Sequence, residues 1–357
     1  TINFWLSIKS KTLFFPSSVD ADNNDGEGGY YWFKKEVIYK YLSNKELEYI
    51  ALKYNMSAQN LHENKWHIHN NFNINIPDER ILLRKLNTIR SSNLYPEIDR
   101  KAICSWNCMM VVGLVDAGIT YKNYKWLRLS EEILKSIYDN FTKKNHCSRL
   151  VYENKIVNGT LEDYAWLIAA SIKISSISHS VFWLEKSLFW LELALEKFWD
   201  TDKGLFAYSM NQSLYKQTFE VEDQVVPSSN SIMANNLYDL YQISRNENYL
   251  KKIKIMMNRV AFKANKWLPN FTNWMLLKQK LNDKKFQYLT MGLEHNEILE
   301  LHHKKNNLAT VYILEKESNI LIFKEKYQEK VKNIFICNEN SCISEIDNVK
   351  DALRVKI

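Results

Sequence analysis

The sequence predicts a mainly α-helical chain whose helices form an α/α toroid, in which a ring of inner helices is surrounded by outer ones. Three times along the chain, a short polar motif precedes a strongly apolar helix, and a helix with a charged face follows. The repeats are about 60 residues apart, and a repeated helical hairpin of this size indicates stacked units that share one core. Helices that are apolar nearly all round are buried, whereas amphipathic helices line the outside. The opening motifs of the inner helices should therefore gather at one end of the ring.

Each predicted inner helix begins at a polar motif. The predicted inner helices span residues 103–118, 161–176 and 228–244, and the outer helices span 126–143, 181–199 and 246–262. The opening motifs are Ser105-Trp106-Asn107, Glu162-Asp163-Tyr164 and Pro227-Ser228-Ser229-Asn230-Ser231, with Asp223 just before the last. Polar residues directly before an apolar run are a helix-start signal, so the motifs indicate where each inner helix begins.

The pattern changes on both sides of these hairpins. Residues 16–30 form a loop rich in Asn, Asp and Gly, and short helices are predicted at 34–42, 44–54 and 77–92. From residue 285, strand-like runs at 286–291, 309–314 and 333–337 alternate with polar helical stretches. We therefore predict a toroid in residues 1–284 and a small α/β module with a few parallel strands in residues 285–357.

The beginning of the chain suggests an incomplete ring. Position 1 is not Met, and the first residues have the pattern of the end of a helix. We expect that an N-terminal part with the first hairpins is missing. Because each repeat covers the apolar flanks of its neighbours, such a chain should dimerise, aggregate or bind its missing segment.

Composition disfavours several classes of function. The net charge of +7 comes from lysines spread over many predicted surfaces, without the stripe of arginines and aromatic residues typical of nucleic-acid binding. The sequence contains no apolar run of 18 residues, so no membrane span is predicted. Five cysteines without a disulfide framework favour a reducing compartment, so we expect a cytoplasmic protein. Cys337 and Cys342 could form a redox or metal pair, but further ligands are lacking, and we expect no metal and no cofactor.

Taken in order, the motifs resemble the barrel part of the thioredoxin-domain-containing proteins related to spermatogenesis-associated protein 20 and bacterial YyaL. The matching segments are Asp20-Ala21-Asp22 with Glu27-Gly28 and Tyr31-Trp32, Asp99 and Lys101 with Ser105-Trp106-Asn107, Leu161-Glu162-Asp163-Tyr164-Ala165, and Pro227-Ser228-Ser229-Asn230-Ser231. The resemblance covers most of the chain. It implies a six-hairpin glycosidase-like α/α toroid, similar to N-acylglucosamine 2-epimerases and several glycoside hydrolases.

Two departures limit what this resemblance implies. Family members carry an N-terminal thioredoxin-like domain and a first pair of barrel hairpins, and this sequence shows neither. Ser229 stands where the family usually has Gly, so this helix start needs a different backbone conformation or a neighbour that makes room. The implied partners are a saccharide and a thioredoxin-like domain or the missing N-terminal segment. We expect no nucleic-acid and no membrane partner.

Asp163 and Asp223 are the candidate catalytic residues. Inverting glycosidases use two carboxyl groups roughly 6.5–9.5 Å apart, one as acid and one as base. Carboxylates from adjacent hairpins could reach that separation. The alternative is structural, because a carboxylate near the start of a helix is stabilised by free N–H groups and by the helix dipole. The sequence leaves both interpretations open.

The candidate substrate-binding residues lie near the predicted mouth of the ring. They are Trp106, Asn107, Glu162, Tyr164 and Asn230 of the opening motifs, with Asp20 and Asp22 in a loop that could fold over the mouth. Aromatic rings and polar side chains can stack on and hydrogen-bond a sugar. A Trp in the position of Trp106 is more often part of the core, and N-capping explains the motif around Asn230.

The predicted function is carbohydrate-related, either sugar binding or hydrolase-like activity through carboxylates in the lumen, and enzymatic activity is left open. The competing prediction is a non-catalytic scaffold that partners a thioredoxin-like domain. A sugar 2-epimerase is less favoured, because those of this superfamily use His pairs and none of the eight His opens an inner helix. A deep acidic and aromatic pocket at the inner-helix starts would favour the first prediction.

Overall fold

The computed structural model describes residues 1–11, 13–152, 155–210, 217–283, 286–304, 309–338 and 341–355. The chain divides into two compact units, one formed by Thr1–Phe15 with Lys101–Ile357 and the other by Pro16–Arg100. This division differs from the predicted boundary at residue 284. The C-terminal strands fall in the same unit as the helical hairpins, whereas the segment before the hairpins forms a unit of its own.

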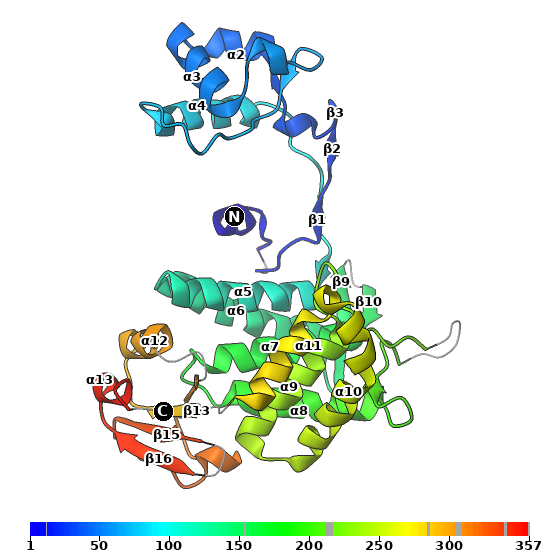
Figure 1. The fold of residues 1–357 in the computed structure, drawn as a ribbon, viewed down its shortest axis with the longest axis vertical. Helices are drawn as coiled ribbons and strands as arrows, with labels where there is room; N and C mark the ends of the chain where they lie inside the picture. Colours follow the sequence, from blue (N-terminus) through cyan, green and yellow to red (C-terminus); the bar gives the residue numbers. More distant parts are fainter. Residues whose placement is uncertain are drawn as a thin grey trace. The chain divides into compact units, whose positions relative to one another are not determined.

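Helical hairpins stack side by side in the first unit, and three of them lie in the described residues (Figure 1). They are α5 (Cys104–Thr120) with α6 (Tyr124–Phe141), α7 (Leu161–Ser175) with α8 (Phe182–Phe198), and α9 (Ser229–Ser244) with α10 (Glu247–Lys266). Helix α7 packs against both α5 and α9, so the inner helices are neighbours. The predicted mainly α, toroid-like arrangement of alternating inner and outer helices is confirmed.

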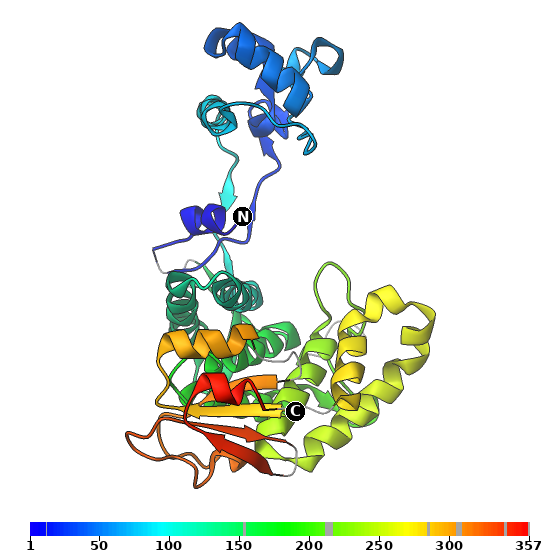
Figure 2. The ribbon, with the colours of Figure 1, turned by 60° about the vertical axis from the view of Figure 1, so that its left-hand side comes forward.

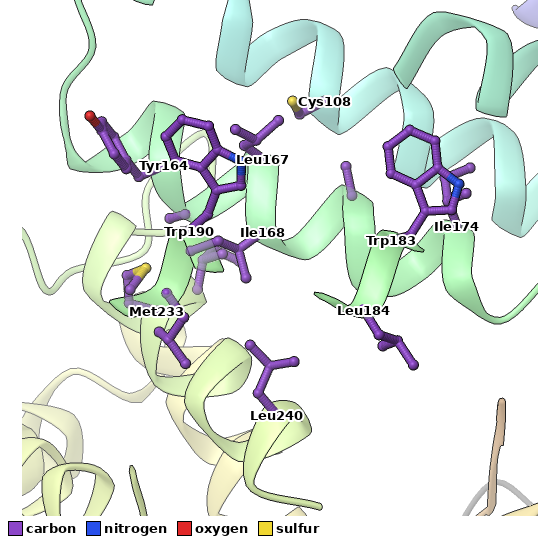
Figure 3. Packing of buried hydrophobic residues seen from close by; sticks show 14 of the residues in the cluster. Cys108, Tyr164, Leu167, Ile168, Ile174, Trp183, Leu184, Trp190, Met233 and Leu240 are labelled. Carbon is purple, nitrogen blue, oxygen red and sulfur yellow. The ribbon is translucent and has the colours of Figure 1, made fainter. Parts of the chain in front are cut away.

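The inner helices are more buried than the outer ones. Helix α9 buries twelve of its 16 residues, whereas α10 buries five of its 20. Helix α7 likewise buries eleven of 15 residues, against eight of 17 in α8. Figure 3 shows the common core that results, with Cys108 of α5, Leu167 of α7, Trp190 of α8 and Met233 of α9. Burial of apolar side chains from adjacent hairpins is the main favourable contribution to folding here.

Short strands occupy the segments that precede the three inner helices. They are β7 (Ala102–Ile103), β8 (Thr142–Lys143), β9 (His146–Tyr152), β10 (Lys155–Asn158), β11 (Trp199–Asp200) and β12 (Leu205–Phe206). Strand β9 pairs with β7, β8 and β10, and β7 leads directly into α5. At Gly159 the chain passes so close to β9 that a Cβ would lie 2.5 Å from the Cys147 carbonyl oxygen. These pairings hold the start of α5 near the start of α7.

A four-stranded sheet completes the first unit, together with α1 (Ile2–Ile8) and α11 (Thr272–Asn282), the latter packed on α9. Its strands are β13 (Phe286–Met291), β14 (Ala309–Ile313), β15 (Asn333–Cys337) and β16 (Cys342–Ile346), in the order β14-β13-β15-β16. The expectation of a few parallel strands is met by β13 and β14 alone, and the other pairs among these strands are antiparallel.

Strands β13, β14 and β15 are buried on both faces of the sheet, whereas the edge strand β16 is largely exposed. Leu289, Tyr312 and Phe335 belong to the hydrophobic core of the hairpins. Their neighbours on the other face pack with α12 (His295–Lys304) and α13 (Val349–Ala352). Figure 2 shows the strands and α12, in orange and red, alongside the hairpins. The alternation of side chains along each strand therefore joins the sheet to the helical core.

The second unit has a small core of its own. Its helices are α2 (Lys35–Tyr41), α3 (Asn44–Tyr54) and α4 (Glu79–Ser91), close to the predicted ranges. Its strand pairs are β1 (Ser18–Val19) with β6 (Ile98–Asp99), β2 (Asp22–Asn23) with β3 (Gly26–Glu27), and β4 (Phe33–Lys34) with β5 (Lys65–Trp66). Ile38, Ile50 and Leu82 lie in one apolar cluster that includes the three helices. The pairing of β1 with β6 places the first and last segments of this unit side by side.

Candidate functional site

The opening motifs of the inner helices meet at one end of the hairpins. The Ser105 backbone N–H donates to Asp163 Oδ1 over 3.1 Å and so joins the starts of α5 and α7. The Leu161 backbone N–H, at the start of α7, donates to the carbonyl oxygen of Tyr208 over 2.9 Å. Two residues before Tyr208, Phe206 is hydrogen-bonded to Asn230 of α9. The expected gathering of the motifs is therefore observed.

Asp163 is fully buried and accepts hydrogen bonds through both carboxylate oxygens. Oδ1 accepts from the Ser105 N–H, and Oδ2 accepts from the Thr160 N–H over 2.9 Å and the Thr160 hydroxyl over 3.2 Å. Arg149 Nη1 lies 3.3 Å from Oδ2. Thr160 and Asp163 form a capping box, in which the first turn of α7 satisfies its own free N–H groups. Asp163 thus caps two inner helices at once.

Asp223 has a similar arrangement at the start of α9. Oδ1 accepts from the Ser228 N–H over 2.9 Å and from the Ser231 hydroxyl over 2.8 Å. Oδ2 accepts from the Asn273 N–H over 2.9 Å, at the beginning of α11. The side chain therefore holds the starts of α9 and α11 together, and 7% of the residue is exposed.

Asn107 and Asn230 make matching contacts in different hairpins. Asn107 Oδ1 accepts from the Phe15 N–H over 2.8 Å, and its Nδ2 donates to the Phe15 carbonyl oxygen over 3.3 Å. Asn230 binds the N–H and carbonyl of Phe206 in the same two-way manner, over 2.8 and 2.9 Å. Both amides are buried. Each amide therefore supplies hydrogen-bond partners for the backbone N–H and carbonyl groups of a segment that lies beside the start of an inner helix.

Ser229, where the resembling family has Gly, finds a partner for its side chain. Its hydroxyl donates to Glu220 Oε2 over 2.7 Å, and its backbone N–H lies 3.2 Å from the same oxygen. Glu220 therefore caps α9 from the preceding link. This role could not be predicted from the sequence, because Glu220 lies outside the opening motif.

Glu162 differs from these capping carboxylates. Within the described residues, its hydrogen bond comes from a side chain, with Arg149 Nη1 2.9 Å from Oε2. Burial raises the pKa of Glu162, Arg149 opposes the rise, and Asp163 and Glu220 add to it. Burial also disfavours the charge on Arg149, but Asp163 and Glu162 outweigh it and raise the pKa of the guanidinium. Glu162 is thus a carboxylate of altered acidity at the edge of the site.

A cavity of about 450 Å³ lies at the start of α7. Its lining residues are His146, Asn158, Gly159, Thr160, Ser209 and Met210. Among the residues that the structure describes, the buried Nε2 of His146 has no hydrogen-bond partner. Arg149 Nη1 donates to the Thr160 hydroxyl over 3.2 Å, so the cavity wall is connected to the Arg149–Glu162 pair. Sequence reasoning missed His146 and Arg149, because both lie in β9 and come near α7 through strand pairing.

The other predicted site residues lie in different surroundings. Tyr164 is fully buried, its hydroxyl accepts from the Cys147 N–H over 3.2 Å, and its ring packs against Trp190 and Phe198. Trp106 is 40% exposed at the start of α5. Asp20 and Asp22 are exposed residues of the second unit, where Asp20 Oδ1 accepts from the Asp22 N–H.

Two further observations bear on the predicted class of protein. No helix within the described ranges is both long and apolar enough to cross a membrane. Cys337 and Cys342 form a disulfide between β15 and β16, while Cys104, Cys108 and Cys147 are free and buried. The cysteine count favoured a reducing compartment, and this disulfide does not support that expectation.

Comparison with known proteins gives sequence relatives but no matching family model. An uncharacterised protein of Caenorhabditis elegans is 23% identical over 253 residues, which cover 64% of this chain and 33% of that protein. Human spermatogenesis-associated protein 20 is 24% identical over 189 residues, 48% of this chain and 23% of the human protein. The rat protein of the same name matches at 24% identity over 186 residues. The chain is homologous to spermatogenesis-associated protein 20. It spans about a quarter to a third of the length of these relatives.

Solved structures with a similar arrangement are sugar-processing enzymes of low sequence identity. An α-mannanase of glycoside hydrolase family 76 from Bacteroides thetaiotaomicron is 14% identical, with a TM-score of 0.39 over 52% of this chain and 55% of that one. Cellobiose 2-epimerase from Bacillus thermoamylovorans is 11% identical, with a TM-score of 0.40 over 72% of this chain and 68% of the enzyme. At these scores the likeness carries no functional argument.

Proposed function

We propose that this chain binds a saccharide at the start of α7, with Glu162 and Arg149 at the edge of the site. The observation that carries the proposal is a cavity of about 450 Å³ that is lined by His146 and by Thr160, whose hydroxyl accepts a hydrogen bond from Arg149 of this ion pair. A concave site of several hundred Å³ with a few convergent polar groups is typical of small-ligand binding. Sugar hydroxyls donate and accept, so they suit both His146 and the Glu162–Arg149 pair.

Binding is favoured over hydrolysis. A glycosidase needs one carboxylic acid and one free carboxylate that reach the substrate. The oxygens of Asp163 and Asp223 already accept bonds from the backbone, and Glu220 caps α9. If the protein does cleave a glycosidic bond, we propose Glu162 as the acid, because its raised pKa favours the protonated form.

The test is titration of the purified chain with neutral mono- and disaccharides, using wild type, Glu162→Gln and Glu185→Gln. Glu185 is exposed on α8 and serves as the matched control. We expect Glu162→Gln to weaken binding by about tenfold or more, which corresponds to roughly 1.4 kcal/mol, and Glu185→Gln to leave it unchanged. Equal affinity in all three proteins, or no saccharide binding at all, would overturn the proposal.

A non-catalytic scaffold is the second candidate, and the capping roles of Asp163 and Asp223 favour it. Both predicted catalytic carboxylates are accounted for by helix capping without any ligand. The family resemblance implies a thioredoxin-like domain as the partner of such a scaffold. The same titration separates the two candidates, because a scaffold shows no saccharide affinity that depends on Glu162.

A further inference from the structure

Another cavity, of about 470 Å³, lies on the inner face of the hairpins, toward the C-terminal halves of the inner helices. Side chains one turn apart on each inner helix line it: Val112 and Asp116 of α5, Trp166 and Ala169 of α7, and Asn235 and Asp239 of α9. Gln287 of β13 and residues 309–312 line it as well. The C-terminal sheet thus supplies part of the cavity wall.

The charged side chains of this cavity form pairs of opposite sign. Lys173 of α7 pairs with Asp116 of α5. Lys280 of α11 pairs with Asp239 of α9 over 3.5 Å, and its ammonium group also donates to Asn235 Oδ1 over 3.0 Å. Each lysine is therefore compensated by an aspartate. A site of balanced charge favours a neutral ligand over an anion such as a phosphate.

In the described part of the chain, three polar atoms of residues that line this cavity are buried without a hydrogen-bond partner: Gln242 Nε2, Gln287 Oε1 and Trp166 Nε1. Gln242 and Gln287 are 4% and 1% exposed. Leaving buried polar groups unpaired is unfavourable, so a molecule that paired with these three groups would be stabilised here. They present two donors and one acceptor.

The orientation of the glutamine pair is fixed by a neighbour. Gln242 Oε1 accepts from Gln287 Nε2 over 2.9 Å and from Arg245 Nη1 over 3.4 Å. Arginine can only donate, so turning the Gln242 amide round would place its NH₂ group against another donor. The unpartnered donor on Gln242 and the unpartnered acceptor on Gln287 are therefore consequences of the packing.

We infer that this inner cavity is a binding site for a neutral sugar ring. Each sugar hydroxyl can donate and accept at once, so neighbouring hydroxyls can satisfy Gln242 Nε2 and Gln287 Oε1 together. Trp166 offers an apolar ring surface and an N–H donor. A planar base carries polar groups only around its edge. The polar groups of this cavity come from α7, α9, α11 and β13, so they suit a sugar ring, which carries hydroxyls on several sides, better than a planar base. This site is distinct from the one proposed at the start of α7 and does not depend on it.

The experiment is calorimetric titration of the full chain with D-glucose and D-mannose, with adenosine as a planar comparison. The variants are Gln287→Met, which removes the unpartnered acceptor at similar length, and Trp166→Phe, which keeps a ring but removes the N–H. Gln279→Met is the matched control, because Gln279 is exposed on α11. Glu162→Gln is included to separate the two sites.

We expect Gln287→Met and Trp166→Phe each to weaken binding of one of the sugars at least tenfold, and Gln279→Met and Glu162→Gln to leave that binding unchanged. The thermal midpoint of Gln287→Met should stay close to that of wild type, because the substitution removes an unpartnered buried acceptor but also the Nε2 donor to Gln242 Oε1. If Gln287→Met fails to fold, Trp166→Phe carries the test. Preferential binding of adenosine, unchanged sugar affinity in the folded variants, or no binding, as expected if water alone fills the cavity, would overturn the inference.

Discussion

At the scale of single residues, a carboxylate at the start of a helix can either satisfy backbone N–H groups or act on a ligand. Asp163 and Asp223 do the first, because each accepts backbone hydrogen bonds at the starts of two helices. Glu162, next to Asp163 in the sequence, accepts no backbone hydrogen bond within the described residues and is bound by Arg149, which also contacts Asp163. Adjacent residues of one helical turn therefore have different roles.

Asp163→Asn should destabilise the protein strongly. An amide in this position loses one acceptor oxygen and places NH₂ against the Thr160 N–H and Arg149, which are both donors. We expect the free energy of unfolding to fall by about 3 kcal/mol, as for breaking a buried charged pair. Helix-dipole stabilisation alone would be worth about 0.3–1 kcal/mol. Urea unfolding of Asp163→Asn beside Asp139→Asn, an exposed control on α6, measures the difference.

The pH dependence of stability should change in Glu162→Gln. The raised pKa of Glu162 means that its charge opposes folding above that pKa. This destabilisation disappears when the pH is below 4.5, the ordinary pKa of a glutamate side chain. Below that pH the carboxyl group is protonated in both the folded and the unfolded chain. The variant should thus be more stable than wild type at pH 7, and the difference should shrink as the pH falls to 4. A variant that is less stable than wild type at pH 7 would show that attraction to Arg149 outweighs burial.

Sequence reasoning identified the residues around the site better than their roles. The motif containing Glu162 and Asp163 predicted which residues gather at the helix starts. It could not show that Asp163 reaches the Ser105 N–H of another hairpin, because that contact depends on how α5 and α7 pack. Arg149 and His146 escaped notice for the same reason, since β9 brings them to α7. Long-range contacts of this kind leave no local pattern in the sequence.

At the scale of elements, each asparagine at the start of an inner helix fastens a neighbouring stretch of backbone. Asn107→Ala would leave the Phe15 N–H and carbonyl without their partner, and Asn230→Ala would do the same to Phe206. Unpaired buried groups cost about 1–3 kcal/mol each, so we expect each variant to lose about 2–3 kcal/mol of unfolding free energy.

The control for this prediction is Asn140→Ala. Asn140 is exposed on α6, and its amide donates within the same helix, to the Ser136 carbonyl. Its loss should change stability by less than about 0.5 kcal/mol. If Asn107→Ala and Asn230→Ala in chemical unfolding behave like this control, the two asparagines do not hold the links in place.

Helix positions were predictable where the apolar pattern was strong. The inner helices predicted at 161–176 and 228–244 are observed at Leu161–Ser175 and Ser229–Ser244. The strands at 286–291 and 333–337 are also observed in place. The direction of strand pairing was mostly missed, because β13 and β15 are antiparallel. A strand's own residues do not specify the direction of its partner, which depends on the connection between them.

At the scale of the whole molecule, the division into two units leads to a deletion experiment. The Pro16–Arg100 unit has its own apolar cluster, and the pairing of Ser18 with Asp99 brings its two ends together. A short Gly-Ser linker in place of Pro16–Arg100 should leave the hairpin unit helical, with a cooperative thermal transition. Loss of that transition in circular dichroism, or aggregation of the shortened chain, would show that the two units depend on each other for folding.

Hydrogen–deuterium exchange with and without a neutral saccharide tests the proposed site at the start of α7 most directly. It reports on backbone amides at both ends of the inner helices in one measurement. We predict slower exchange in peptides covering residues 158–166 when the sugar is present, and no such protection in Glu162→Gln. Protection confined to the outer helices, or equal protection in wild type and Glu162→Gln, would contradict saccharide binding through Glu162.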